Sequence, residues 1–513
     1  MNRQKICPLS GEIFEISDQE IQLFKKMGLK DPIYVPKIRN AMRMAFRNER
    51  NLYIRKCDFS GERIISMYNE SHRFPVYKYD YWLSDKRNPP CLDYNPKKDF
   101  FEQYGELQKL TPHANLFAPY NENCAYVSAA EKNKNCYMIY VTDRCEDCYY
   151  LHTSFNCRDC IDSAYLIDSE LCYECTDCRN LYHCRMCFLC DNSSNLSFCF
   201  DMRGCSDCFM CYGLRNQKYC IQNQPFAKEE YEKKIKDIDF RSYIIFSDLK
   251  EKFIKEIVEN KPYVRMINTE NCNGNFLINC KNCHYCYNLD EAEDCRYSRT
   301  GSNHVKDIID SHATVDGSEL IYNNVSTTES YNCHNVIGCW TTRESCYSEF
   351  LQGCQDCFGC ISLRYKKYCI LNKQYTPDEY TKIKGYIINQ LGDYYGSPFP
   401  FKFAPFSYQD SAFRDYASLD KNEVEKIGWF YGEEKPTDKN KLFKIIPQEK
   451  KLLNKIQVPL PEKHHDIRFE ERVRFRNKAI LQPSPYLSVG EYTVKSIVLK
   501  KHTSEPQKKY IKK

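Results

Sequence analysis

Uncharged side chains recur at every third position in the stretch from Cys124 to Cys220. The stretch contains 17 cysteines, and every pair of them is separated by a multiple of three residues. The other positions in the same phase hold residues such as Val127, Ser163 and Leu166, and none of them is charged or aromatic. An α-helix would repeat every 3.6 residues and a flat strand every two. The pattern therefore predicts a coil in which every third side chain faces a narrow core.

A longer period of twelve residues runs through the same stretch. Its main column comprises Cys124, Cys136, Cys148, Cys160, Cys172, Cys184, Leu196, Cys208 and Cys220. The inward spacing resembles that of the beetle antifreeze solenoids, and this resemblance implies a coil of four short sides with one inward side chain on each. Successive coils would stack through parallel backbone hydrogen bonds about 4.8 Å apart. Because such a coil has room only for small groups, cysteine is expected there mainly as a small apolar filler.

Asn or Asp stands directly before this column in six of the coils. A short polar side chain suits a tight corner of the backbone, so these residues are predicted to form the corners of successive coils. They are Asn123, Asn135, Asp147, Asp159, Asn195 and Asp207.

The coil pattern occurs twice in the chain. The run Gly204-Cys-Ser-Asp-Cys-Phe-Met-Cys returns 149 residues later as Gly353-Cys-Gln-Asp-Cys-Phe-Gly-Cys. Each copy is followed by a helix-like stretch that contains Tyr231 or Tyr380, and this stretch is expected to cover the open end of the coil stack. The second copy is looser, because Cys346 breaks the phase.

A second duplication lies outside the first. A shift of 429 residues, without a gap, superimposes residues 14–62 on residues 443–491. We therefore predict that the same small domain opens and closes the chain. Its matched charged residues include Glu20 with Glu449, Arg39 with Arg468, Arg43 with Arg472 and Arg47 with Arg476.

These patterns predict a mainly β protein. Two tandem parallel β-solenoids with about twelve residues per coil, expected to be right-handed, are flanked by small α+β zinc-finger-like end domains. Leu249, Phe253 and Ile257 lie four residues apart among charged residues, which predicts a helical linker. The expected order is a basic, degenerate zinc-finger-like domain (1–70), a connector (71–120), arm 1 (121–227), a helical cap and linker (228–268), arm 2 (269–375), a helical cap and extended segment (376–442), a degenerate copy of the first domain (443–500) and a basic tail (501–513).

Charge is unevenly distributed along the chain. Residues 1–56 carry 12 Lys/Arg against 6 Asp/Glu, and residues 433–513 carry 20 against 10. Against a total of +5, the two ends therefore carry +6 and +10 and the middle carries −11. Basic ends on an acidic body predict an anionic partner for the ends, and the alternative is that basic tails only aid solubility.

Arginine clusters in both end domains are the candidate nucleic-acid-binding residues. Guanidinium groups suit phosphate oxygens, and neighbouring aromatic rings can stack on bases. A protein partner and a solvated helix face remain alternatives, since arginines three and four residues apart also occur on exposed helices. The candidates are Arg39, Arg43, Arg47, Arg50, Arg55, Arg468, Arg472, Arg474 and Arg476.

Four thiols of arm 1 are the candidate metal ligands. Cys145, Cys148, Cys157 and Cys160 form two Cys-x-x-Cys pairs, a spacing typical of zinc sites. The same spacing follows from two adjacent coils with two inward corners each, so plain packing, a zinc or cluster site and disulfides all stay open. We expect no cofactor, with zinc as the exception to test.

The chain resembles an uncharacterised cysteine-rich solenoid family of candidate-phyla bacteria with small genomes. The marks of this resemblance are Ala45-Phe-Arg-Asn-Glu-Arg-Asn-Leu-Tyr-Ile-Arg-Lys-Cys57-Asp-Phe-Ser-Gly61, the run Trp82-Leu-Ser-Asp85-Lys and the arms ending in Leu-Arg before Tyr-Cys-Ile. The resemblance implies end domains like zinc-binding fingers. Here they keep only Cys7 and Cys57, because other residues replace the remaining thiols: Ser10, Val35, Ile38, Ser60, Lys78, Tyr81 and, opposite Cys57 in the closing copy, Tyr486.

Enzymatic function is not expected from this sequence. It contains no glycine-rich phosphate loop, nucleophile elbow or His-Glu zinc motif. The first residues lack the apolar stretch of a signal peptide, and no run of about 18 apolar residues occurs, which predicts a cytoplasmic protein with reduced thiols and no membrane partner. The expected function is non-catalytic binding, in which the basic ends hold RNA, with the ribosome as candidate, and the acidic arms act as rigid spacers or docking surfaces. The alternatives are a protein-interaction scaffold, with Tyr137, Tyr149 and Tyr173 on its outer surface, or a metal-binding thiol-rich protein.

Overall fold

The computed structural model describes residues 3–84, 87–258, 264–433, 442–474, 476, 481–483 and 497–499. They belong to two compact units. Unit 1 comprises Met1–Asn115, Tyr263–Glu434 and Ala479–Leu499, and unit 2 comprises Leu116–Pro262, Lys435–Lys478 and Lys500–Lys513. The basic tail predicted at 501–513 lies outside the described residues.

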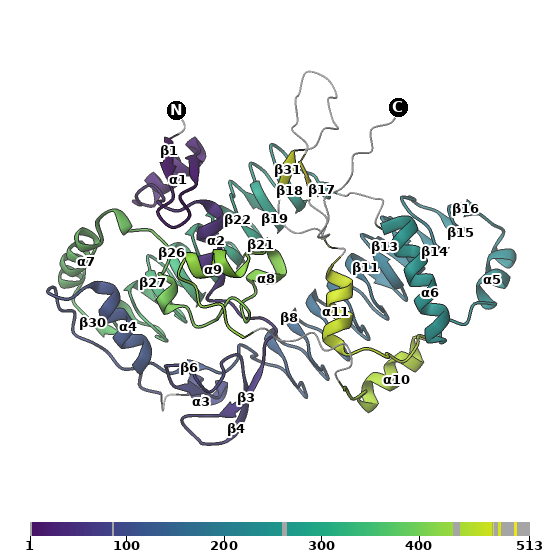
Figure 1. Cartoon of the computed structure of the whole chain (residues 1–513), viewed down its shortest axis with the longest axis horizontal. Coiled ribbons are helices and arrows are strands. Elements are labelled where there is room, and N and C mark those ends of the chain that lie inside the picture. The colour runs from purple at the N-terminus through teal and green to yellow at the C-terminus, as the bar shows by residue number, and fades with distance from the viewer. Residues whose placement is uncertain are drawn as a thin grey trace. The chain divides into compact units, whose positions relative to one another are not determined.

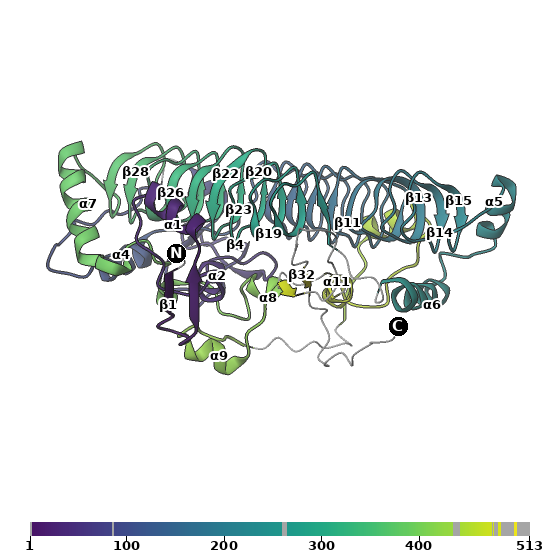
Figure 2. The same cartoon turned by 90° about the horizontal axis from the view of Figure 1, so that it is seen from above.

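Unit 2 contains a sheet of ten strands, which we call arm 1, and its strands follow one another in chain order (Figure 2). Apart from the last pair, neighbouring strands are parallel, and each residue pairs with the residue twelve positions later, as in Ser128 with Tyr140 and Cys208 with Cys220. The predicted period of twelve therefore reappears as the register of the sheet. The strands are β7 (Ser128–Glu131), β8 (Tyr140–Asp143), β9 (His152–Phe155), β10 (Ala164–Ile167), β11 (Thr176–Tyr182), β12 (Arg185–Phe188), β13 (Asp191–Phe200), β14 (Ser206–Phe209), β15 (Lys218–Ile221) and β16 (Gln224–Pro225).

Unit 1 contains a sheet of fourteen strands, which we call arm 2. Its register is less regular, with an offset of 11 residues between Met266 and Leu277 and of 13 between Ala292 and Val305, and this explains the looser sequence pattern. The strands are β17 (Met266–Ile267), β18 (Asn273–Ile278), β19 (His284–Asp290), β20 (Ala292–Glu293), β21 (Arg299–Ser302), β22 (Val305–Ile309), β23 (His312–Val315), β24 (Glu319–Tyr322), β25 (Val325–Thr328), β26 (Tyr331–Trp340), β27 (Cys346–Glu349), β28 (Gln355–Phe358), β29 (Lys367–Ile370) and β30 (Lys373–Gln374).

The arms turn at residues in the left-handed conformation. In arm 1 every third residue from Tyr120 to Gln222 has a positive φ, and the residue after it faces the core. Asn and Asp tolerate this conformation better than most residues. The predicted corner role of Asn123, Asn135 and Asp147 is therefore confirmed, with φ between 50° and 54°.

Polar atoms of the core residues satisfy the backbone of the next coil. Ser163 Oγ accepts the N–H of Cys175 at 3.1 Å, and Cys178 Sγ accepts the N–H of Cys190 at 3.5 Å. Thiols also donate, as Cys148 Sγ does to the carbonyl of Cys157 at 3.4 Å. Cysteine is therefore more than the apolar filler that we expected, because Cys and Ser fit the narrow core and also provide the hydrogen bonds that the corners need.

Helices follow the last strands of each arm (Figure 1). Tyr219 packs on Tyr231 with ring centroids 5.8 Å apart, and Tyr368 packs on Tyr380 at 5.9 Å, so the predicted helical stretches occupy equivalent places. Cys346, which breaks the phase, lies on the outer face of arm 2 in a cluster that includes Tyr380. The helices are α5 (Lys228–Lys236), α6 (Tyr243–Phe253) with a π-helical turn (Ile254–Val258), α7 (Pro377–Leu391), α8 (Phe413–Tyr416) and α9 (Lys421–Lys426), with 3₁₀ turns at Gly392–Tyr394 and Phe401–Phe403.

The two end segments repeat a pair of helices 429 residues apart. Helices α1 (Asp18–Lys26) and α2 (Pro36–Met44) correspond to α10 (Pro447–Lys455) and α11 (His465–Val473). The outer duplication therefore extends to the structure of the described residues. The remaining elements are β1 (Arg3–Ile6), β2 (Ile13–Ile16), β3 (Tyr53–Lys56), β4 (Arg63–Ser66), β5 (Val76–Tyr77), α3 (Tyr79–Leu83), α4 (Phe100–Leu110), β6 (His113–Ala114), β31 (Leu481–Pro483) and β32 (Ile497–Leu499).

Two hairpins in the first end domain have turns with the same hydrogen-bond pattern. Cys7 N–H donates to Glu12 O at 2.9 Å and Gly11 N–H to Cys7 O at 2.8 Å, and the hairpin of Cys57 repeats both bonds with Glu62 and Gly61. Burial raises the pKa of the Cys7 thiol, but hydrogen bonds from Ser10 and from nearby backbone groups outweigh it, so its pKa is lowered overall. Each hairpin therefore presents one thiol that is hydrogen-bonded within its own turn.

None of the helices among the described residues has the length and apolar character needed to span a bilayer.

Candidate functional site

Six of the nine predicted nucleic-acid-binding arginines are buried. Their exposed fractions are between 0% and 7%, and the six are Arg39, Arg43, Arg47, Arg55, Arg468 and Arg472. A guanidinium group without exposed surface cannot reach a phosphate. The assignment of these six residues to phosphate contacts is therefore corrected.

Cluster 1 is the arginine cluster of unit 1. Arg39 and Arg43 lie one turn apart on α2, so both reach Asp310 at a corner of arm 2. Arg39 Nε lies 2.8 Å from Asp310 Oδ2, and Arg43 Nη1 lies 3.6 Å from Asp310 Oδ1. Glu20 of α1 completes the cluster at 3.2 Å from Arg39 Nη2. These ion pairs join the first end domain to arm 2.

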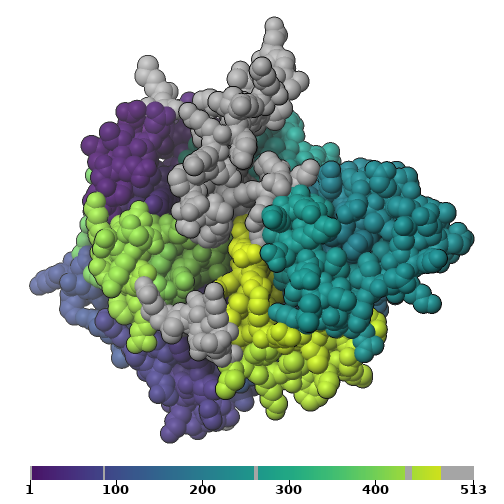
Figure 3. Space-filling view, turned by 45° about the vertical axis from the view of Figure 1, so that its right-hand side comes forward, coloured from purple at the N-terminus to yellow at the C-terminus, as the bar shows by residue number. Residues whose placement is uncertain are grey.

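Cluster 2 repeats this arrangement in unit 2. Arg468 and Arg472 of α11 both pair with Asp162, and Arg472 Nη1 lies 2.9 Å from Asp162 Oδ1. Glu449 of α10 lies 3.5 Å from Arg468 Nη2. Figure 3 shows the closing segment, in yellow, against the teal surface of residues in unit 2. Both clusters therefore place two helical arginines on one corner aspartate of an arm.

Burial changes the proton affinity of the cluster 1 side chains. Desolvation lowers the pKa of Arg43 to about 10, although the neighbouring Asp310 acts in the opposite direction. Desolvation also raises the pKa of Asp310, although Arg39 and Arg43 lower it. Each charge is therefore costly to bury alone and is stabilised by its partner.

The other predicted arginines also have partners within the chain, or lie at the surface. Arg47 contacts Glu49 and Ser326, both at 2.5 Å, and Arg55 lies 2.8 Å from Asp58 Oδ2. Arg476 Nε lies 2.8 Å from Asp177 Oδ1, with 12% of its side chain exposed. Arg50 is half-buried and Arg474 is exposed. Arg50 and Arg474 thus remain nearest to solvent.

The tyrosines predicted to line an exposed face of arm 1 are mostly covered. Tyr149 is 5% exposed and Tyr173 is 4% exposed, whereas Tyr137 is half-buried. Tyr173 packs against Phe246 of α6, with ring centroids 5.4 Å apart. The prediction is wrong for Tyr149 and Tyr173, which are both buried, and the linker helix α6 covers Tyr173.

The four candidate metal ligands of arm 1 lie together in its core, where each thiol is hydrogen-bonded to two of the others. Cys145, Cys148, Cys157 and Cys160 are buried, and their thiols donate to carbonyls of the next coil at 3.4 to 3.5 Å. No three of their sulfur atoms lie within 4.8 Å of one another in this fully described stretch. Burial raises the pKa of Cys148, whereas hydrogen bonds from Cys148 and Cys157 lower the pKa of Cys145 to about 6. Packing and hydrogen bonding account for the positions of these thiols, and metal binding by them stays a prediction.

Another group of side chains has a composition compatible with zinc. His464, His465 and Asp466 each place one ligand atom within 4.8 Å of the others, and the His465 Nδ1 atom lies 3.2 Å from Asp466 Oδ1. His464 Nδ1 also accepts the N–H of Asp466 at 3.2 Å, as the cap of α11. The structure thus gives His464 a role in starting the helix, as its N-cap.

An exposed column of alternating charge runs along arm 1. Successive members are parallel bridge partners on neighbouring coils, and the column comprises Glu122, Lys134, Glu146, Arg158, Glu170 and Tyr182. Side-chain exposure is 74% at Glu122 and 33% at Glu170, and Glu146 is half-buried. Arg158 Nη2 lies 2.8 Å from Glu170 Oε1, whereas Lys134 and Glu122 are 4.0 Å apart. We call this set the charge column.

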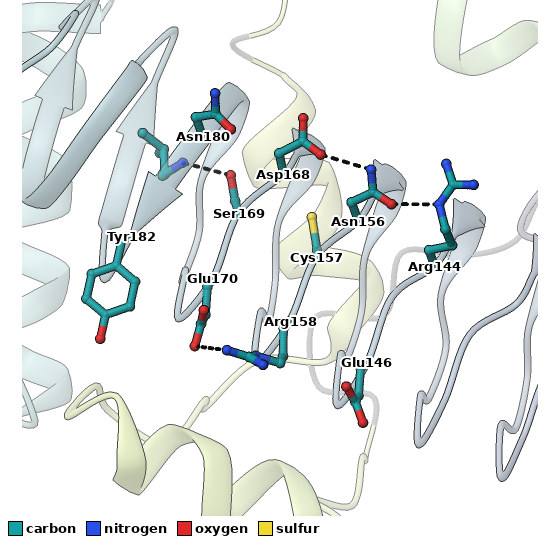
Figure 4. A pocket seen from close by; sticks show the side chains of 11 residues that line it. Arg144, Glu146, Asn156, Cys157, Arg158, Asp168, Ser169, Glu170, Asn180 and Tyr182 are labelled. Carbon is teal, nitrogen blue, oxygen red and sulfur yellow. Dashed lines mark hydrogen bonds and ion pairs between the residues drawn. The ribbon is translucent and has the colours of Figure 1, made fainter.

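The charge column forms one wall of a groove in arm 1 (Figure 4). The groove has a volume of about 540 Å³. A hydrogen-bonded row forms the other wall, in which Arg144 Nε donates to Asn156 at 2.7 Å and Asn156 donates to Asp168 at 2.9 Å. The groove therefore offers charged and amide groups at each coil.

Arm 2 carries the same charge column. Its members are Glu270, Lys281, Glu293, Lys306, Glu319 and Tyr331, and they are also neighbours in the parallel ladder. The second wall of the groove has changed, because Glu291, His304, Gly317 and Glu329 replace Arg144, Asn156, Asp168 and Asn180. The column has thus kept its sign at every coil while its neighbours diverged. The signal was present in the sequence as charged residues of alternating sign, 11 to 13 positions apart, each two residues before a core position.

Comparisons with known proteins leave the activity open. No family model and no curated protein matches the chain. Among solved structures, a chain from Desulfovibrio desulfuricans G20, described as an acetyltransferase, is similar over 51% of this chain and 69% of its own length. Its sequence identity is 10% and its TM-score is 0.12, so the likeness carries no argument about this chain.

Proposed function

We propose that the chain is a non-catalytic β-solenoid scaffold of the cytoplasm that binds a macromolecular partner through the exposed faces of its arms. The observation that carries this proposal is the charge column, which is exposed in both arms and identical in sign. The end domains would brace the arms, since their arginines pair with arm aspartates. The reduced thiols of a cytoplasmic protein agree with a core in which cysteines donate hydrogen bonds to carbonyls.

RNA binding by the ends is the second candidate. It is favoured by exposed Arg474 and by the excess of basic residues in 433–513. Against it, the buried clusters leave few of the predicted arginines able to release counterions from a phosphate backbone.

Binding and cross-linking measurements on the purified full chain separate the two candidates. We expect the RNA affinity at physiological salt to be no better than non-specific binding, with a dissociation constant of about 10⁻⁴–10⁻⁶ M. Carboxyl-to-amine cross-links in cell extract should map to residues of the charge columns. Tight RNA binding that is lost in an Arg50→Gln and Arg474→Gln variant, with cross-links confined to the end domains, would reverse the order of the candidates.

A further inference from the structure

The two charge columns contain more charge than the stacking of coils requires. Neighbouring coils lie about 4.8 Å apart, so like charges on adjacent coils would repel. Neutral residues avoid that repulsion equally well, as in the row Asn123, Asn135 of arm 1, where one amide donates to the next at 2.9 Å. Exposed ion pairs add only about 0–1 kcal/mol each. Stacking thus explains why the signs alternate but not why charge is kept in both arms.

Each column also contains a carboxylate that the column itself does not neutralise. In arm 1, Glu122 pairs with Lys134 and Arg158 with Glu170, while Glu146 makes no ion pair within 4.0 Å among the described residues. In arm 2 the carboxylate without an ion pair is Glu319, which lies at the position of Glu170 in arm 1. Each column ends in an exposed tyrosine, Tyr182 at 52% and Tyr331 at 40%. The columns therefore keep the features of a contact surface.

The spacing of the column selects among possible partners. An extended peptide repeats its side chains on one face every ~6.8 Å, which loses register with coils ~4.8 Å apart within two or three steps. A nucleic acid presents only negative charge, and each column contains three carboxylates and two basic groups. A stack of parallel strands, such as a second copy of the column, presents alternating charge at the same spacing.

We infer that the charge column is a self-complementary docking surface and that its partner is a second copy of this chain. If two columns face each other with an offset of one coil, each Glu except one at the end of each column lies opposite a Lys or Arg. Of the five charged positions, four then face an opposite charge. The carboxylate left over in each column, Glu146 or Glu319, gains a cation from the other copy. This inference rests on the proposed scaffold function and names its partner.

Sedimentation equilibrium of the full chain tests the inference. The wild-type chain should self-associate at low salt and become monomeric in 1 M NaCl, where the screening length falls to about 3 Å. Gln at Lys134, Arg158, Lys281 and Lys306 should weaken association by at least about tenfold, because four facing pairs lose one charge each. Exchanging Glu with Lys throughout both columns keeps the alternation, so this variant should associate like the wild type.

A matched control removes four basic residues elsewhere. Gln at Lys132, Lys228, Lys234 and Lys421, which are all exposed and ion-paired on the surface, should leave association unchanged. Thermal unfolding of each variant shows whether the arms stay folded. A wild-type chain that is monomeric up to its solubility limit at low salt overturns the inference. Self-association that is unchanged in the variant with Gln at the four basic column residues also overturns it. If such a monomer still cross-links to another protein through the columns, the scaffold function stands and only the identity of the partner is wrong.

Discussion

Clusters 1 and 2 join their helices to an arm with the same charges in different surroundings. In cluster 1 the paired arginines lie among apolar side chains of one large core that includes Phe24, Ile38 and Tyr322. In cluster 2 the described part of the docked segment holds α10 and α11, with Leu453 and Phe469 buried and Phe469 against His152 at 5.3 Å. The charges are common to both, so they specify where the helices dock. The apolar side chains around each cluster add to how strongly the helices dock, and the core of cluster 1 extends over arm 2 and α7.

Removing the corner aspartate should have the largest effect and should distinguish the two clusters. Asp162→Asn leaves Arg468 and Arg472 buried with one carboxylate, Glu449, at a cost of about 3–5 kcal/mol. Hydrogen exchange of residues 465–473 should then accelerate by two orders of magnitude or more, while arm 1 keeps its protection. Asp310→Asn should cost as much but leave α2 docked, because the apolar core holds it.

An exposed corner provides the control for these variants. Asp168 lies on the same arm and accepts a hydrogen bond from Asn156. Asp168→Asn should leave hydrogen exchange in α11 unchanged. Equal undocking of α2 and α11, or none in either, would contradict the roles assigned to charge and apolar area.

Acid should destabilise unit 1 through two buried histidines. Burial lowers the pKa of His312 and of His334 to about 3. In the unfolded chain these side chains take up protons below pH ~6.5, whereas in the folded chain they stay neutral down to about pH 3. Stability is therefore complete above pH ~6.5 and is lost as the pH falls toward 3, by about 1.4 kcal/mol per pH unit for each histidine.

Urea unfolding between pH 7 and pH 4 measures this loss. Replacing His312 and His334 with Gln removes the titrating groups. The slope of the unfolding free energy against pH should then decrease by about 1.4 kcal/mol per pH unit for each replaced histidine. His304 is exposed, and His304→Gln should leave the slope unchanged. An unchanged slope in the double variant would show that other groups carry the acid sensitivity.

A core serine tests whether Cys and Ser are interchangeable in the arms. Ser163 accepts the N–H of Cys175 at 3.1 Å, and Ser311 of arm 2 accepts that of Asn324 at 3.3 Å. Ser163→Val removes the acceptor and should cost about 1–3 kcal/mol, because an N–H is left buried and unpaired. Ser163→Cys should cost less, since a thiol serves the same role at Cys178. Chemical denaturation gives both values, and equal costs would mean that volume alone matters.

A single charge of the column should matter least for folding. Arg158→Gln breaks an exposed pair with Glu170 and should leave the unfolding free energy close to that of the wild type, because solvent screens the pair. The same comparison holds for Lys306→Gln in arm 2, which breaks the pair with Glu293. Thermal unfolding measures both. A loss of several kcal/mol in either would mean that the column is part of the fold rather than a surface for binding.

Local periodicity was sufficient to predict the strand arrays. The spacing of three, with Asn or Asp before cysteine, corresponds to left-handed corners that recur every third residue, and the period of twelve corresponds to the parallel register. Both features depend on interactions within one coil and its neighbour. The end-domain duplication was also visible, because a shift of 429 residues without a gap matches the two sequences. The structure repeats it, since α1 and α2 reappear as α10 and α11.

The arginines show where sequence reasoning fails. Arg39, Arg43, Arg468 and Arg472 lie four residues apart in each pair, which fits an exposed helix face as well as a buried one. Their partners are corner aspartates between 267 and 310 residues away in the chain. Tyr149 and Tyr173 were placed at the surface because the sequence of one coil does not show what covers it.

The sequence by itself determined how each coil closes and how coils stack, because hydrogen bonding and volume repeat every three and every twelve residues. The sign of each charge column was also present in the sequence, because every charged member stands two residues before a core position. Only the tertiary structure decided which charges meet, since an ion pair between distant segments depends on where whole helices dock. Burial of the arginines and exposure of the columns both follow from that docking, because a side chain's contact with solvent is set by its neighbours in space.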